Sequence, residues 1–540
     1  MQFDYLIVGA GSAGCVLANR LSEGGWHRVL LLEAGPDDGR FWLRAPLGYA
    51  KSYHDAAVNW MLWSEPAPTL GGRRLYYPRG KVLGGSSAIN ALVYSRGQPE
   101  DFDGWEAEGN PGWGWKDVLP CYRRMEDLEL GASEFHGCGG LLHVTDVSQK
   151  VHPLCRAFLA AGEEAGFAVN ADLNGASTEG VGCYQITTRD GRRESASRAY
   201  LAPARGRANL RVETDAQAVR SLFEGRRAVG VEYRQQGETK RALAAREVIL
   251  AAGAIGSPHL LMLSGVGPGD ELRRQGIAVL QDAPAVGRQL HDHIGFDHYF
   301  RARVPSLNSR LASPWSQLLA GLEYLLLRRG PLSMSLNQAG GFLRTSAAQE
   351  RPNLQLYFCP LAYEKPQAGS PEVIAVEAEP AFSLSGSPCR PKSRGFLRLK
   401  SRDPLVPPEI HPNFLDDPAD MAEALESFAL IRKIAASPSL AAVIDSETKP
   451  GPAVRSADEV AAYIRSTCYS IFHPVGTCRM GRRPETSVVD SRLRAHGLGG
   501  LRVIDASIFP AVTSGNTNAP AMMVGEKGAT LVLEDAVRPG

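Results

Sequence analysis

Two polar side chains near the end of the 540-residue chain could take part in proton transfer. One is His473, in the stretch Ile-Phe-His-Pro-Val-Gly-Thr, and the other is Asn518, in Gly-Asn-Thr-Asn-Ala-Pro. A neutral imidazole can remove a hydroxyl proton near pH 7, and an amide can orient the oxygen and stabilise the charge that develops on it. Without its context, such a histidine is more often a hydrogen-bonded residue of a core or turn. The elements around both residues must therefore decide whether they form a site.

The clearest binding motif begins at the N-terminus. An apolar strand over 3–8 leads into Gly9, Gly11 and Gly14, which have the G-x-G-x-x-G spacing, and a helix is expected over 13–21. The glycines permit a tight turn, close approach of N–H groups to a pyrophosphate, and close packing of helix on strand. The next strand, 29–32, ends at Glu33, whose carboxylate can accept hydrogen bonds from an adenosine ribose. This order predicts a dinucleotide-binding βαβ unit rather than an ordinary βα turn.

Two later loops have small residues that suit a ligand. Gly84 and Gly85 are followed by two serines and open what is expected to be a short helix, although a plain capped turn fits this pattern equally well. A strand that begins at Leu501 ends at Asp505-Ala506-Ser507, which suits a ribityl chain or a phosphate.

Another buried strand, 247–253, lies far along the chain from the first two. It leads into a helix that Ser257 would cap, with Pro258 in first position and Gly265 as its stop. The return to such a strand predicts a nucleotide-binding domain that is assembled from discontinuous segments.

The middle of the chain predicts a second unit. One helix is expected over 105–125, and further strands and helices between 353 and 466; a β-meander over 210–233 leads into the strand 247–253 of the nucleotide-binding domain. A helix over Trp315–Arg329 places leucines on one face: Leu318, Leu319, Leu322, Leu325 and Leu326. We expect this face to pack within the second unit, and docking on a membrane or partner is the alternative.

Composition narrows the class of protein. A share of 44% hydrophobic and 22% charged residues is typical of a soluble globular protein of two to four domains, and a net charge of +1 gives no reason to expect nucleic acid. No apolar run reaches the roughly 18 residues of a transmembrane helix, and no leader is apparent, so we expect an uncleaved cytoplasmic protein. His291 and His293, with His298, fit a polar turn better than a metal site, and we expect no metal.

Together these motifs resemble the glucose–methanol–choline (GMC) family of flavin oxidoreductases, and within it the bacterial alcohol dehydrogenases and choline dehydrogenases. The resemblance covers nearly the whole chain. Its carriers are the N-terminal glycine loop with Glu33, residues 80–90, 253–267 and 473–476, and Asp505-Ala506-Ser507 with Asn516-Thr517-Asn518.

The resemblance implies an α/β fold, α+β as a whole, in which a Rossmann-like FAD-binding domain is joined to a substrate domain with an antiparallel sheet and covering helices. The FAD domain would comprise 1–150, 198–295 and 470–540, and the substrate domain 151–197 and 296–469. The residues implied to contact FAD are Gly9, Gly11, Ser12, Ala13, Gly14, Glu33, Ala34, Trp60, Leu83, Gly85, Ser86, Asn90, Ala91, Leu92, Val93, Ala218, Ala252, Gly253, Asp505, Ala506, Asn516 and Thr517. Some members attach FAD through a histidine after the double glycine; this chain has Ser87-Ala88-Ile89 there, which predicts non-covalent FAD.

The resemblance also implies the chemistry. His473 would be the general base and Asn518 its polar partner while an alcohol, expected to be primary, passes hydride to flavin N5 and becomes an aldehyde. The electrons would go to a quinone or another non-oxygen acceptor. The alternatives are an alcohol oxidase that forms hydrogen peroxide, a choline dehydrogenase and, more remotely, a non-redox flavin lyase. Peripheral association with the inner membrane is an alternative to a purely cytoplasmic location.

Overall fold

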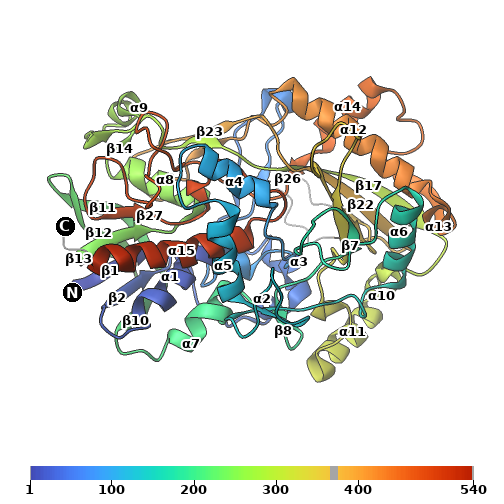
Figure 1. Cartoon of the computed structure of the whole chain (residues 1–540), viewed down its shortest axis with the longest axis horizontal. Helices are drawn as coiled ribbons and strands as arrows, with labels where there is room; N and C mark the ends of the chain where they lie inside the picture. Colours follow the sequence, from blue (N-terminus) through green and yellow to red (C-terminus); the bar gives the residue numbers. More distant parts are fainter. Residues whose placement is uncertain (1, 365–374, 538–540) are drawn as a thin grey trace.

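The computed structural model of the protein describes residues 2–364 and 375–537. Two large sheets lie toward opposite ends of the long axis, and helices surround both (Figure 1). This arrangement confirms the predicted fold class of mixed helix and sheet.

The first sheet collects strands from distant parts of the sequence. Its order is β10-β2-β1-β13-β12-β11, with β27 beside β13. Strand β1 is parallel to both of its neighbours, and β27 is parallel to β13. The carboxyl ends of β1, β2, β13 and β27 therefore meet at one edge, where a doubly wound sheet binds its ligand. The strands are β1 (Gln2–Val8), β2 (Val29–Leu32), β10 (Leu210–Glu213), β11 (Ala216–Glu224), β12 (Arg227–Gln235), β13 (Glu238–Leu250) and β27 (Leu501–Val503).

Helices cover this sheet and bring the two ends of the chain together. The helix after the first glycine loop, α1, contacts the C-terminal helix α15, which in turn contacts α5, and α8 contacts β11 (Figure 1). The helices are α1 (Ser12–Ser22), α4 (Pro99–Ala107), α5 (Trp115–Met125), α8 (Gly253–Leu263), α9 (Gly269–Arg274) and α15 (Asn518–Val537), with short 3₁₀ helices η3 (Gly85–Ala88) and η6 (Ala506–Ile508).

The second sheet is antiparallel, with the order β18-β19-β22-β17-β25 and β26 beside β17. Helix α12 contacts β22, and β7 contacts β18. The strands are β7 (Gly180–Cys183), β17 (Ile294–Ala302), β18 (Ala339–Leu343), β19 (Leu354–Cys359), β22 (Ala381–Pro388), β25 (Ile444–Lys449) and β26 (Tyr469–Ser470), and the helices are α6 (Pro153–Glu164), α10 (Leu307–Leu311), α11 (Pro314–Leu327), α12 (Pro418–Ala435), α13 (Pro438–Ala441) and α14 (Ala457–Thr467).

Further short elements lie around the two sheets. They include α2 (Phe41–Arg44), α3 (Tyr49–Ser52), β3 (Leu62–Trp63), β4 (Tyr76–Tyr77), β5 (Glu126–Leu128), β6 (Leu142–Val144), β8 (Thr188–Arg189), β9 (Arg192–Arg193), α7 (Ala202–Ala204), β14 (Val266–Gly267), β15 (Gln281–Asp282), β16 (Arg288–Leu290), β23 (Gly395–Arg398) and β24 (Glu409–His411). The domain boundaries stay a prediction, and residues 1, 365–374 and 538–540 of those ranges lie outside the described part.

The predicted meander and the predicted long helix both differ from the structure. The antiparallel meander consists of β11, β12 and β13, whereas β10 is parallel to β2. The turn after β10 is held at β2 because Ala216 N–H donates to the Glu33 carbonyl (2.8 Å). The expected helix over 105–125 is two helices, α4 and α5, because Gly109 and Gly112 between them have φ of +98° and +81°.

Helix α8 begins earlier than its sequence predicts. It starts at Gly253, so Pro258 lies inside the helix and Ser257 is not its cap. A proline inside a helix leaves the carbonyl four residues earlier without its N–H donor. Here that carbonyl belongs to Ala254, and it accepts a hydrogen bond from the Thr477 hydroxyl (2.5 Å), which replaces the missing bond.

Helix α11 presents its leucine row to solvent, and the expectation that this row packs within the second unit is wrong. Leu318, Leu319 and Leu326 are 51%, 51% and 78% exposed, whereas the buried side of the helix carries Ala320 and Tyr324. Within the described ranges the structure holds no helix with the length and apolar character that would let it cross a membrane.

Candidate active site

A cavity of about 620 Å³ begins at the carboxyl edge of the first sheet and extends to residues 471–474, just after the second sheet. Most of the residues predicted to contact a cofactor line it: Gly9, Gly11, Ser12, Ala13, Glu33, Ala34, Trp60, Gly85, Ser86, Asn90, Ala91, Leu92, Val93, Ala218, Ala252, Gly253, Asp505, Ala506, Asn516 and Thr517. Gly14 and Leu83 do not line it; both are buried. His473 and Asn518 also border the cavity.

The glycine loops form a narrow backbone wall. Gly9 has a φ of +99°, and a Cβ atom there would lie 2.6 Å from the Ala251 carbonyl oxygen. A Cβ at Gly14 would lie 1.9 Å from the Gly9 oxygen, so its role is to let α1 pack on the strand. A Cβ at Gly85 would lie 2.7 Å from the Gly11 Cα, which shows how closely the two loops approach each other. Side chains at these positions would displace backbone.

The end of the cavity that lies beside Gly11 and Glu33 fits the ADP half of FAD. Gly11 caps the N-terminus of α1, and a Cβ there would meet only the Ala251 oxygen, at 3.9 Å. A phosphate can therefore approach N–H groups at the positive end of the helix. Glu33 is 5% exposed and accepts from the N–H groups of Ala10 (2.9 Å) and Gly35 (3.0 Å), and its oxygens retain lone pairs for ribose hydroxyls.

Asp505 ties the end of β27 to helix α8. One carboxylate oxygen accepts from Gly253 N–H (2.8 Å) and the Ser257 hydroxyl (2.5 Å), and the other accepts from Ser507 N–H (2.8 Å). This residue therefore shapes the cavity wall as well as bordering the cavity.

His473 lies in a loop that many hydrogen bonds hold in place. Its backbone N–H donates to Asp292 Oδ1 (2.8 Å), and the Ser470 hydroxyl donates to Asp292 Oδ2 (2.6 Å). The preceding residue, Phe472, has the left-handed φ of +69°, and its carbonyl accepts from Arg79 Nη2 (2.7 Å). Strained backbone that is held by such contacts is typical of functional sites.

A hydrogen-bonded chain fixes which nitrogen of His473 carries the proton. The Cys389 carbonyl can only accept, so His293 Nε2 is the donor in their 2.8 Å contact. A neutral His293 is then an acceptor at Nδ1, and His473 Nδ1–H donates to it (3.0 Å). His473 therefore presents an unprotonated Nε2, the form that a general base requires.

Asn516, and not Asn518, contacts this nitrogen. The Asn516 Nδ2 group lies 3.1 Å from His473 Nε2. Its orientation is fixed because Gln355 Nε2 donates to Asn516 Oδ1 (3.1 Å), and Gln355 is itself held by the Tyr357 hydroxyl (2.7 Å). Gln355 and Tyr357 belong to β19, so the second sheet sets the geometry of the site.

Asn518 borders a different part of the cavity, beside the first glycine loop. It is the first residue of α15, and its Oδ1 accepts from the Ser12 hydroxyl (2.7 Å). The structure thus brings His473 and Asn516 together and places Asn518 beside the first glycine loop. The two asparagines are only two residues apart. Asn516 lies in the loop before α15, whereas Asn518 is the first residue of that helix.

Burial keeps His293 and His473, the two histidines of this hydrogen-bonded chain, neutral. Desolvation is the main reason that the pKa of His473 lies well below its ordinary value, and the neighbouring His293 and Arg79 lower it further. Burial also lowers the pKa of His293 to about 4. A neutral His473 can accept a proton, whereas an imidazolium cannot.

Several residues of the site were not predicted. Tyr53, Arg79, His259 and Phe472 line the cavity, and His293 acts through His473. Arg79 stands inside the glycine-loop stretch, but only the fold shows that its side chain reaches the 470s loop. His293 stands among other histidines in the sequence, but its partner His473 is 180 residues away, so the sequence does not show that the two are in contact.

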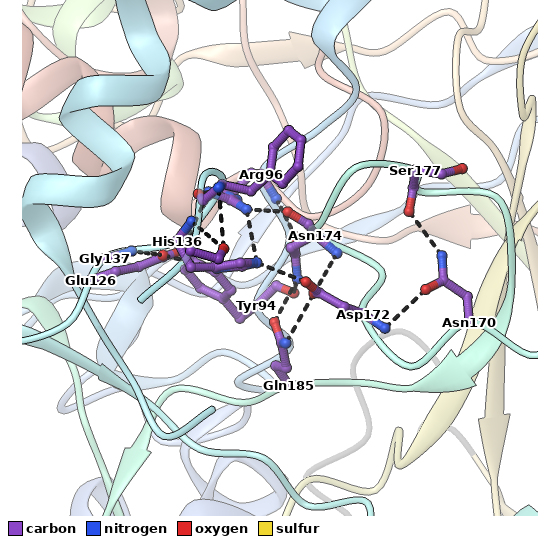
Figure 2. A network of polar contacts seen from close by, with 12 residues as sticks. Tyr94, Arg96, Glu126, His136, Gly137, Asn170, Asp172, Asn174, Ser177 and Gln185 are labelled. Atoms are coloured by element: carbon purple, nitrogen blue, oxygen red, sulfur yellow. Dashed lines mark hydrogen bonds and ion pairs between the residues drawn. The ribbon is translucent and has the colours of Figure 1, made fainter. Parts of the chain in front are cut away.

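A buried polar network anchors the chain just after the cavity-lining residues 90–93 (Figure 2). His136 Nδ1 contacts Glu126 Oε2 (3.0 Å), and its Nε2 contacts Asp172 Oδ2 (2.9 Å). Asn174 accepts from Arg96 N–H (3.1 Å) and donates to the Tyr94 carbonyl (3.2 Å). The network fixes the residues that follow this cavity wall.

The histidine-rich turn has no metal-binding geometry. In the described ranges, no group of three or more His, Cys, Asp or Glu side chains could hold a metal ion. His291 Nε2 contacts the Pro391 carbonyl (2.8 Å), and the His298 ring lies against Phe428, with centroids 4.3 Å apart.

Comparison with known proteins gives a consistent family. Two models, both described as GMC oxidoreductase, match residues 3–295 and 391–525. The chain is 44% identical to "Alcohol dehydrogenase [acceptor]" of Pseudomonas putida, over 98% of this chain and 96% of the relative. It is 40% identical to "Choline dehydrogenase, mitochondrial" of Homo sapiens, over 98% of this chain and 90% of the relative.

Solved structures share the whole fold. Pyridoxine 4-oxidase from Mesorbium loti superposes with a TM-score of 0.88 and 32% identity, covering 98% of both chains. A structure concerned with FAD modification in Aspergillus oryzae formate oxidase has a TM-score of 0.91 and 25% identity, covering 99% of this chain and 98% of the other.

Proposed function

The chain belongs to the GMC oxidoreductase family, and on this premise we propose that it is an FAD-dependent dehydrogenase that oxidises a primary alcohol to the aldehyde. The electrons pass to a quinone or another non-oxygen acceptor. The observation that carries this proposal is the hydrogen-bonded chain from Cys389 to Tyr357, which leaves His473 with an unprotonated nitrogen beside the amide of Asn516.

At the end of the cavity that His473 borders, His473 and Asn516 have different roles. The alcohol oxygen takes a position within hydrogen-bonding reach of both His473 Nε2 and the Asn516 amide, and it replaces the direct 3.1 Å contact between these two groups. His473 removes the hydroxyl proton, and the Asn516 N–H group donates to the oxygen as negative charge develops on it. The imidazolium that forms keeps its Nδ1–H bond to His293. When bound, FAD supplies the acceptor for the hydride of the alcohol carbon.

The residues that would hold FAD lie at the other end and along the wall. Gly11 and Ser12 would meet the pyrophosphate, and Glu33 would accept from the ribose. Binding is proposed to be non-covalent, because residues 85–90 (Gly-Ser-Ser-Ala-Ile-Asn) contain no histidine, cysteine or tyrosine.

We propose a neutral alcohol as the substrate in preference to choline. The Arg79 side chain is hydrogen-bonded to the carbonyl of Phe472, the residue before His473, so a cationic substrate would meet its positive charge. The carboxylates that line the cavity, Glu33 and Asp505, are both engaged by N–H groups of the chain. Tyr53, Trp60 and Phe472 offer apolar surface to an aliphatic or aromatic alcohol.

The substrate and acceptor can be tested together. Purified protein is given aliphatic, aromatic and choline-like alcohols, first anaerobically and then in air with an artificial dye. We expect a neutral alcohol to bleach the flavin, rapid dye reduction, little peroxide, and weak activity with choline. Absence of bleaching by every alcohol would favour the flavin lyase, and peroxide formed as fast as the dye is reduced would make the protein an oxidase.

The dependence of kcat/KM on pH tests the state of His473. Because burial lowers the pKa of this group, the neutral base persists as the pH falls below 6.5. We expect kcat/KM for the best alcohol to stay level from pH 8 through pH 6 and to fall only at more acid pH, when His473 becomes protonated. An acid limb centred at or above pH 6.5 would contradict this environment for His473.

A further inference from the structure

The outward face of α11 carries an unusual row of apolar side chains. Trp315, Leu318, Leu322, Leu325 and Leu326 are 68%, 51%, 45%, 52% and 78% exposed, and their spacing places them on one side of the helix. The side that faces the protein is smaller, with Ala320 and Tyr324 buried. A helix that turns its larger apolar face to water is expected to bury that face against something else.

A neighbouring element, α2, adds two partly exposed aromatic side chains. Phe41 of α2 contacts Tyr324, with ring centroids 6.0 Å apart, and Phe41 and Trp42 are 41% and 44% exposed. In Figure 1, α11 stands at the lower edge of the molecule, and it contacts α10. We call the exposed residues of α11 together with Phe41 and Trp42 the docking face.

Positive charge borders the docking face at one end. Arg328 lies over the Tyr324 ring at 5.1 Å. Arg44 is the last residue of α2, the helix of Phe41 and Trp42, and Arg192 is in β9, which contacts α2. Arg329 is exposed. In the part of the chain that the structure describes, none of these four arginines has an ion pair, and the one acidic residue of α11, Glu323, is already paired with Arg310 (2.9 Å).

This charge distribution decides what can cover the face. In a symmetric dimer, a second copy of the chain would bring the same arginines to this face and no free carboxylate from α11. An interfacial helix with tryptophan and leucine on one side and arginine at its border is suited to a bilayer with anionic headgroups. We propose that the docking face binds the surface of an anionic lipid membrane, with the apolar row in the acyl boundary and the arginines at the phosphates.

Docking of this face would bring the lipid surface close to the cavity. Leu311 of α10 and Ala320 of α11 belong to one buried cluster with Tyr49, and Tyr53 and Ala91 pack against that cluster. Tyr53 and Ala91 also line the cavity. The proposal of membrane binding depends on the exposed residues of the docking face and the arginines at its border, and not on the reaction proposed above.

Vesicle binding tests the proposal. Full-length protein is sedimented with phosphatidylcholine vesicles and with vesicles that also contain phosphatidylglycerol. We expect binding to the anionic vesicles that weakens as salt is added, and at least about tenfold weaker binding for the triple variant Leu318→Glu, Leu322→Glu, Leu326→Glu. A matched control, Leu130→Glu with Leu243→Glu, changes leucines that are 56% and 46% exposed elsewhere, and it should bind like the wild type.

Dye-linked activity and thermal unfolding of the triple variant, both expected to match the wild type, show that it is folded. Wild-type protein that binds neither kind of vesicle would overturn the proposal, as would equal losses in the control variant. A dimer in solution that the triple variant dissociates, without vesicle binding, would instead identify a second copy as the occupant.

Discussion

Replacing His473 by alanine is expected to give a folded, yellow protein whose turnover of alcohol is lower by roughly 10²–10⁴-fold, the usual contribution of a general base. The side chain lies at the end of the cavity remote from Glu33, so FAD should stay bound. The loss should appear in kcat as well as in kcat/KM, because the proton is removed in the transition state. Steady-state dye reduction, normalised to the flavin absorbance of each preparation, measures the change.

The matched control for this variant is His411→Ala. His411 stacks on Phe396 outside the cavity, with ring centroids 4.4 Å apart, so the change also removes an imidazole from the protein. Its turnover should equal that of the wild type. If the His473 variant kept wild-type turnover with full flavin content, another group would have to be the base.

Variants of Asn516 and Asn518 are expected to have different defects, and that of Asn516 should be in turnover. Asn516→Ala removes the amide beside His473 Nε2, and loss of one such donor typically costs about 10²–10³-fold in kcat. Asn516→Asp has nearly the same size but puts a carboxylate where the amide donates to His473, so it should be equally impaired. Flavin content should be unchanged in both.

Asn518→Ala should behave in the opposite way. It removes the acceptor of the Ser12 hydroxyl at the first glycine loop, so FAD should dissociate more readily while the FAD-saturated enzyme turns over near the wild-type rate. Flavin release, followed by fluorescence, and turnover with added FAD distinguish the two effects. Low kcat in the Asn518 variant and normal kcat in the Asn516 variant would restore the assignment implied by the family resemblance.

The sequence predicted the parts of the site that depend on local backbone. Strand, glycine turn, helix and Glu33 follow one another, so their spacing specifies their geometry. His473 was found as a candidate because it stands in a short motif. Asn516 and Asn518 could not be ranked in that way, since the choice depends on where α15 begins and on Gln355 of β19, more than 160 residues away.

Tertiary contacts explain the predictions that failed. The leucine row of α11 has the period of a buried helix face, and nothing local shows that the opposite face is the one that packs. In α8, Pro258 suggests a helix start, because proline is common at the first position of a helix. Here the proline lies inside the helix, and the Thr477 hydroxyl donates to the Ala254 carbonyl that the proline leaves without a partner. The break between α4 and α5 was visible in principle, because two glycines flank Asn110 and Pro111.

Anaerobic flavin reduction in a single turnover tests the central claim most directly. Wild-type protein and the His473→Ala variant, both loaded with FAD, are mixed with the same neutral alcohol, and the loss of flavin absorbance is followed in a stopped-flow instrument. With His473 as the base, the wild type bleaches rapidly and the variant at least about 10²-fold more slowly. Equal bleaching rates in the two proteins would contradict the account.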